Sequence, residues 1–192
     1  MSDKELLEKV VAGDRKSFNA LYDKFQSQVF RTAFGYFQNT SDAREIVQDV
    51  FVEVYRSAGR FNNMSNLSTW LYRITVNKSL DRLRFQKSAK RFSFFSAIFL
   101  DENSKLRDSI PDDSDHGIET DQKESEKIIH QAMNKLSAAQ KTAFVLTQVD
   151  DLSGKEAAEI MNTTSKAVES LIQRAKANLR KELGKIYDNR RK

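Results

Sequence analysis

The sequence predicts an all-α protein with two small helical domains joined by a flexible acidic linker. Apolar residues recur at helical spacing up to about residue 92 and again after residue 127, while acids dominate the stretch between. The chain has 192 residues, of which 39% are hydrophobic, enough to form one large or two small cores. We therefore expect a first domain at 1–92, a linker at 93–127 and a second domain at 128–192.

Two helices are expected at the start of the chain. Gly13 ends the first and Asp14 is placed to cap the second. The first has a short apolar stripe: Leu6, Leu7, Val10 and Val11. The second has a long aromatic one: Phe18, Leu21, Tyr22, Phe25, Val29, Phe30, Ala33, Phe34 and Phe37. Such a dense stripe is typical of core packing rather than of a cofactor site.

A third helix is expected from Asp42 to Ala58, with Ser41 or Asp42 as its cap and Glu45 completing a capping box. Its apolar stripe is Ala43, Ile46, Val47, Val50, Phe51, Val54 and Ala58. Its outer face is acidic with one apolar residue: Asp42, Glu45, Gln48, Asp49 and Val52. A solvated face and a docking surface for a basic partner both fit this pattern.

A polar loop, 60–69, and a basic, aromatic helix, 70–91, come next. Cations attract phosphates, and exposed rings offer bases a stacking surface. The residues expected to contact nucleic acid are Arg60, Phe61, Asn62, Ser65, Asn66, Ser68, Thr69, Trp70, Arg73, Asn77, Lys78, Arg82 and Arg84. Core packing is the alternative for Trp70 and Tyr72, and we expect it for at least one of them.

This central stretch resembles region 2 of the sigma-70 family. The resemblance rests on EIVQDVF at 45–51, RF at 60–61, STWLYRI at 68–74 and NKSLDRLR at 77–84. The short chain points to the extracytoplasmic-function (ECF) subgroup of bacterial sigma factors. The resemblance implies that the helix at 42–57 binds the clamp helices of the largest RNA polymerase subunit. It also implies that the loop and the next helix capture and melt the minus-10 promoter element.

The stretch between the two domains has two parts. Residues 92–100, FSFFSAIFL, are expected either to pack on the first domain or to form an apolar segment sheltered by a partner. We favour packing. The acidic run at 101–126 contains the only proline, Pro111, and is expected to be flexible.

The second domain is predicted to contain a helix-turn-helix. Ile128, Ile129, Ala132, Met133 and Leu136 form one stripe, and Ser137 with Gln140 and Ser153 with Glu156 have capping-box spacing. Asn162 suits a left-handed turn, and Thr164 is placed to cap a last helix whose stripe is Val168, Ile172, Ala175, Leu179 and Leu183.

The segment 136–183 resembles sigma region 4, whose last helix reads the minus-35 element. The residues facing away from its stripe are Ser165, Lys166, Glu169, Ser170, Gln173, Arg174 and Lys176. Glu169 and Leu171 stand where the family commonly has basic residues, so fewer phosphate contacts are expected.

The composition gives little support for a disulfide, a metal site, a catalytic site or a membrane span. The chain has no cysteine and two isolated histidines, His116 and His130, so we expect no disulfide, metal or cofactor and no catalytic constellation. The charged N-terminus lacks signal-peptide character, and no apolar run approaches the about 20 residues of a membrane span, so we expect a cytoplasmic protein without membrane insertion.

The resulting prediction is an alternative sigma factor without catalytic activity. Its expected partners are core RNA polymerase, at the clamp helices and the flap, promoter DNA and an anti-sigma factor. A helix-turn-helix repressor or activator that works without polymerase is one alternative. A protein-interaction module is another.

Overall fold

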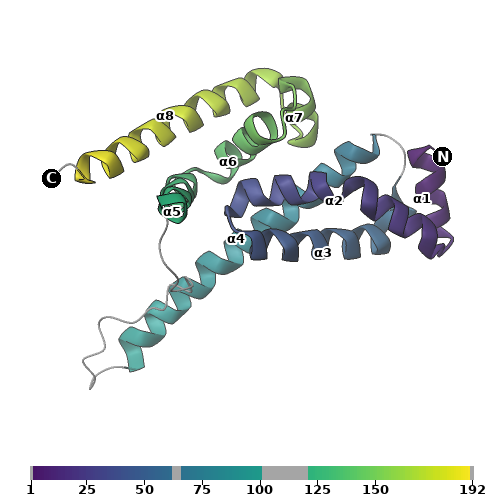
Figure 1. Cartoon of the computed structure of the whole chain (residues 1–192), viewed down its shortest axis with the longest axis horizontal. Helices are drawn as coiled ribbons and strands as arrows, with labels where there is room; N and C mark the ends of the chain where they lie inside the picture. The colour runs from purple at the N-terminus through teal and green to yellow at the C-terminus, as the bar shows by residue number, and fades with distance from the viewer. Residues whose placement is uncertain (1, 62–65, 101–120, 191–192) are drawn as a thin grey trace.

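The computed structural model describes residues 2–61, 66–100 and 121–190, and every regular element in these ranges is helical (Figure 1). The N-terminal half contains α1 (Asp3–Val11), α2 (Arg15–Phe37), α3 (Thr40–Ser57), the 3-10 turn η1 (Ala58–Arg60) and α4 (Leu67–Leu100). The C-terminal half contains α5 (Asp121–Asn134), α6 (Ala138–Phe144), the π-helical turn η2 (Val145–Val149), α7 (Gly154–Ile160) and α8 (Ser165–Arg190). None of the helices in these ranges is apolar over the length that a bilayer span requires.

The first four helices form the bundle that the apolar stripes predict. Asp14 caps α2, because its carboxylate accepts the backbone N–H groups of Lys16 and Ser17. The predicted stripe of α3 is buried along its whole length. The aromatic stripe of α2 packs against it, with the Tyr22 and Phe51 ring centroids 4.6 Å apart, although Phe34 at its end is 37% exposed. Aromatic packing therefore holds α2 and α3 together.

The start of α3 differs from the sequence-based expectation. Asn39, and not Ser41 or Asp42, is the N-cap, and its side-chain oxygen accepts the N–H of Asp42 at 3.0 Å. The run Asn39, Thr40, Ser41, Asp42 contains four good capping residues, so local preference alone does not choose between them. Because α2 ends in a left-handed residue at Gln38 (φ 49°), α3 begins immediately afterwards.

Helix α4 is longer than predicted. It begins at Leu67, where Asn66 accepts the N–H of Thr69 at 3.1 Å in the manner of a cap. It continues to Leu100, so the backbone of the apolar segment 92–100 is helical, while its side chains lie outside the described ones. Helices thus occupy both ends of the predicted linker, at 93–100 and 121–127, and residues 101–120, with Pro111 and His116, lie outside the described ranges.

The C-terminal half confirms the capping predictions. Ser137 with Gln140 and Ser153 with Glu156 form complete capping boxes. Asn162 has φ 51°, and Thr164 accepts the N–H of Ala167 at 3.2 Å. The predicted stripe of α5 is buried except for Ile129, which is 50% exposed. Helices α7 and α8 form the predicted helix-turn-helix.

The two halves pack against each other. One hydrophobic cluster runs without a break from Leu6 in α1 to Ala175 in α8. Helix α2 contacts η2, and α4 contacts α7, whose helix lies beside the N-terminal bundle in Figure 1. The observed arrangement is therefore closed, with the helix-turn-helix held against the first domain.

Candidate protein and nucleic-acid interfaces

The outer face of α3 presents the side chains expected to bind a protein partner. Glu45, Gln48 and Asp49 are exposed, Val52 is 48% exposed, and Asp42 is half-buried. Tyr55, which was not predicted as part of this face, is 61% exposed and lies one turn beyond Val52. Its i, i+3 spacing from Val52 was the available signal. The face thus combines carboxylates with two apolar contacts.

The chain's own cations neutralise part of this acidic face. Arg82 of α4 lies 3.2 Å from Asp42 and 2.6 Å from Glu45. Lys78 lies 2.9 Å from Glu53, and its hydrogen bond lowers the pKa of that carboxyl. Asp49 makes no ion pair with any residue that the structure describes. Its charge is therefore available to a partner.

The structure describes most of the loop residues predicted to bind the minus-10 element. Arg60 and Asn66 are exposed, and Ser68, whose hydroxyl lies 3.0 Å from Gln28 Oε1, and Thr69 are half-buried. Phe61 and Trp70 pack together with ring centroids 5.2 Å apart. Trp70 is half-buried and Tyr72 is buried, which confirms core packing for at least one ring. Asn62 and Ser65 lie outside the described residues.

The cations of α4 point in different directions. Arg73 donates to the backbone oxygen of Glu159 at 2.9 Å, and Arg84 lies 2.6 Å from Asp81. Lys78 and Arg82 face α3, as described above, and Asn77 is exposed. In this closed arrangement each of the four α4 cations predicted to grip DNA has an acidic residue as a neighbour within the chain.

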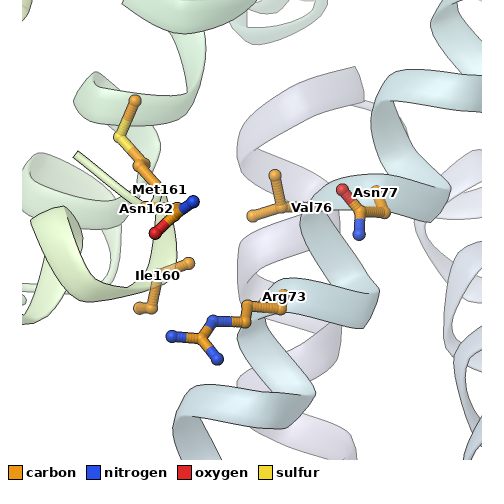
Figure 2. A pocket seen from close by; sticks show the side chains of 6 residues that line it. All are labelled: Arg73, Val76, Asn77, Ile160, Met161 and Asn162. Atoms are coloured by element: carbon orange, nitrogen blue, oxygen red, sulfur yellow. The ribbon is translucent and has the colours of Figure 1, made fainter.

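A cleft separates α4 from the end of α7. Its volume is about 520 Å³, and its lining residues come from both halves (Figure 2). They are Arg73, Val76, Asn77, Ile160, Met161 and Asn162. Figure 2 shows the Arg73 side chain reaching from α4 toward Ile160. Part of the predicted minus-10 surface therefore faces the helix-turn-helix.

The second predicted DNA-binding surface is open to solvent. Lys166, Glu169, Gln173, Arg174 and Lys176 of α8 are exposed. Ser165 and Ser170 are half-buried. Leu171 packs against the core, which explains why this position does not carry a cation. Helix α8 thus presents one amide, one carboxylate and three cations along one exposed face.

Sequence reasoning missed a buried polar cluster between α2 and the C-terminal half. Asp150 accepts from Arg31 Nε at 2.8 Å and from the Thr32 hydroxyl at 2.7 Å. Burial raises the Asp150 pKa, and both donors oppose that rise. Tyr36 donates to Thr142 at 2.7 Å, and burial raises its pKa. These residues are more than 100 positions apart, so no local pattern signals them.

The described parts of the chain, which include His130 but not His116, show no metal-site geometry. No group of three His, Cys, Asp or Glu side chains gathers there as metal ligands would. His130 Nδ1 lies 2.7 Å from the backbone oxygen of Phe37, so this ring joins α5 to the end of α2.

Comparison with known proteins shows the family to which the chain belongs. The model of sigma-70 region 2 matches residues 21–89, and that of sigma-70 region 4 matches residues 126–179. The ECF RNA polymerase sigma-E factor of Haemophilus influenzae is 32% identical over 92% of each chain. The ECF RNA polymerase sigma factor SigW of Bacillus subtilis is 28% identical, covering 95% of this chain and 97% of its own. The chain belongs to the sigma-70 family, in the ECF group of RNA polymerase sigma factors.

Solved structures share the fold. CnrH, in complex with the cytosolic domain of CnrY, superposes with a TM-score of 0.66 at 22% identity, over 95% of this chain and 97% of that one. The sigma factor RpoE of Bartonella quintana, in complex with the anti-sigma factor NepR, gives a TM-score of 0.57 at 22% identity, over 88% and 98% of the two chains. The two-domain helical architecture is therefore the one that this family uses.

Proposed function

We propose that this chain is an alternative sigma factor that binds core RNA polymerase, directs it to specific promoters and helps to melt the minus-10 element. Both region 2 and region 4 are present in family order. The observation that carries the proposal is that each region presents an exposed face of suitable chemistry. One is the acidic and apolar face of α3, and the other is the basic and amide face of α8.

The proposed binding residues form three surfaces, one for polymerase, one for the minus-10 element and one for the minus-35 element. Asp42, Glu45, Gln48, Asp49 and Val52 bind the polymerase clamp helices, with the flap as a second contact. Arg60, Phe61, Asn62, Ser65, Asn66, Ser68, Thr69 and Trp70 engage the minus-10 bases, and Arg73, Asn77, Lys78, Arg82 and Arg84 follow the strand backbone. Ser165, Lys166, Glu169, Ser170, Gln173, Arg174 and Lys176 dock in the minus-35 major groove.

The proposed sigma factor has no catalytic activity of its own and works in the cytoplasm, where polymerase and DNA are found. It also has an anti-sigma partner that covers the polymerase-binding or DNA-binding faces. This part of the proposal is supported by RpoE of Bartonella quintana, which has this fold and was solved in complex with the anti-sigma factor NepR.

Transcription from a random promoter library tests the proposal. Purified protein is mixed with bacterial core polymerase, and initiated transcripts are sequenced. We expect initiation only when the protein is present, from promoters that share two elements at a fixed spacing. Binding to duplex DNA without polymerase, with no initiation, would instead identify a helix-turn-helix repressor.

A further inference from the structure

Phe85 of α4 is an exposed aromatic residue that none of the three proposed surfaces includes. Its side chain is 69% exposed, more than any other large apolar side chain that the structure describes. It follows Arg84, and its exposed neighbours Asp81, Lys87 and Ser88 are polar. A single exposed apolar residue is common on protein surfaces, so its position relative to the proposed surfaces decides what it indicates.

The ion pairs of α4 define the side of the helix on which Phe85 lies. Lys78 and Arg82, which pair with carboxylates of α3, precede Phe85 by seven and three positions, and residues at these spacings share one side of a helix. Arg84 is the preceding residue, and successive helical residues point about 100° apart. Phe85 therefore belongs to the side of α4 that faces α3, and not to the side of Asn77 and Arg84.

Two hydrogen bonds place this part of α4 beside the start of α3. Arg82 Nη2 and Gln86 Nε2, which flank Phe85 in the sequence, each donate to Asp42 Oδ1 at 3.2 Å. Arg82 also lies 2.6 Å from Glu45. The backbone at Phe85 is therefore adjacent to the carboxylates of the α3 face that we assign to polymerase.

Apolar side chains lie on both sides of these carboxylates. Val52 is seven positions beyond Glu45, on the same face of α3, and Asp49 lies between them. Phe85 lies on the other side, beyond the ion pair of Arg82 with Glu45. Protein interfaces commonly combine aromatic anchors with surrounding polar groups. A nucleic acid is a poor fit, because its phosphates would be repelled by the same carboxylates.

We propose that Phe85 is an apolar anchor for core RNA polymerase, so that the docking surface of α3 continues across the ion pair of Arg82 with Glu45 onto α4. The complementary surface of the polymerase is basic opposite the carboxylates and offers the ring an apolar pocket. This inference rests on the proposed sigma function. It adds to that function by assigning a residue of the predicted DNA-binding helix to the protein partner.

Two substitutions of Phe85 test the anchor. Phe85→Ala should weaken binding to purified core polymerase by a factor of about five or more in a titration. Phe85→Leu keeps an apolar side chain but cannot stack on a base, so it should recover most of the affinity. Val11→Ala shortens another exposed apolar side chain, on α1, and is the matched control that should bind like wild type. Because the ring is exposed, both Phe85 variants should melt like wild type by circular dichroism.

A photochemical cross-link identifies what this position contacts. The chain has no cysteine, so Phe85→Cys provides a single thiol, which is labelled with benzophenone-maleimide before polymerase is added. On illumination of the complex with core polymerase and promoter DNA, we expect a cross-link to a polymerase subunit. The same label on Arg84→Cys points about 100° away and should react with polymerase less.

The outcomes separate this inference from the proposed function. Normal core binding by Phe85→Ala would overturn the anchor. A label at position 85 that reacts only with promoter DNA, or only with the chain itself, would overturn it as well. Impaired opening by both Phe85 variants with normal core binding would instead assign the ring to base stacking. If the wild-type chain does not bind core polymerase, the proposed function fails, and this inference fails with it.

Discussion

Arg82 Nη2 lies 2.6 Å from Glu45 Oε2, and this ion pair joins a residue assigned to DNA with a residue assigned to polymerase. Arg82 is partly buried, at 35% side-chain exposure, and it also reaches Asp42. The two surfaces of the first domain are therefore electrostatically connected, because the same guanidinium sets the charge of the α3 face and of the α4 stripe.

Replacing Arg82 by alanine separates these two roles. The pair is half-exposed, so we expect the free energy of unfolding to fall by no more than about 1 kcal/mol. Core binding should persist, because Asp42 and Glu45 keep their charge, while promoter opening measured by permanganate footprinting should fall. Weaker core binding together with normal opening would show that Arg82 serves the polymerase face alone.

Charge reversal at Asp49 tests the polymerase face. Asp49→Lys places a cation on an exposed face of α3 and removes no ion pair among the described residues, so stability should be unchanged. We expect core binding in a pull-down or titration to weaken at least tenfold through repulsion from a basic partner. Asp23→Lys, at an exposed position of α2, is the matched control and should bind normally. Equal binding by both variants would remove Asp49 from the interface.

Asn66 has one observed and one proposed role: its side-chain oxygen accepts the Thr69 N–H at 3.1 Å and so caps α4, and we propose that its amide contacts a minus-10 base. Asn66→Ala removes both and should cost about 1 kcal/mol of stability. Asn66→Ser keeps a capping oxygen and should melt like wild type by circular dichroism. We expect both variants to impair opening more than core binding. Normal opening with Asn66→Ser would leave only the capping role.

The buried side chain of Lys141 should make the free energy of unfolding depend on pH. Burial lowers its pKa from 10.5 to about 8, so the folded chain releases this proton at a pH at which the unfolded chain still holds it. Stability therefore rises with pH between these two values, by an amount on the order of 1–3 kcal/mol. Below the folded pKa the penalty for the buried charge is fully present.

Thermal unfolding between about pH 7.5 and 9.5 measures this effect, below the range in which tyrosines ionise near pH 10. Lys141→Met should flatten the rise, because it removes the titrating group. Lys135→Met, at an exposed lysine, is the matched control and should keep the rise of stability with pH. An identical slope in wild type and Lys141→Met would assign the pH dependence to another group.

Arg174 on α8 should contribute a phosphate contact. With Arg174→Ala we expect weaker minus-35 binding and a decrease of about one in the slope of log K against log salt. Arg180→Ala removes an exposed cation farther along the same helix and should change the slope less. If both variants change the slope equally, the attraction is a general property of the basic helix.

Local patterns predicted most of the fold because caps and apolar stripes act over a few residues. The capping boxes at Ser137 and Ser153 and the turn at Asn162 were all readable from neighbours in the sequence. The cap of α3 was not, because four adjacent residues compete for it. The extension of α4 to Leu100 was also missed, although no Gly or Pro interrupts residues 92–100.

Contacts between residues far apart in the sequence were beyond sequence reasoning. The apolar pattern correctly predicted that the outer faces of α3 and α8 are exposed. It did not reveal that Arg82 forms an ion pair with Glu45 or that Arg73 hydrogen-bonds the backbone oxygen of Glu159. Asp150 stands beside Asp151 in a run that resembles an exposed turn, yet its side chain is fully buried. Its partner Arg31 lies 119 residues away, so only the folded arrangement brings the two together.

The contact of α2 with η2, where a Cβ on Gly35 would lie 2.9 Å from a methyl group of Val145, also bears on how such proteins diversify. Regions 2 and 4 match two separate family models, at residues 21–89 and 126–179. A hybrid that joins residues 1–92 of this chain to a foreign region 4 would keep both helical cores but lose the complementary pairing at α2. A foreign region 4 would need a residue of matching shape opposite Gly35, so we expect the two modules to change together at this contact.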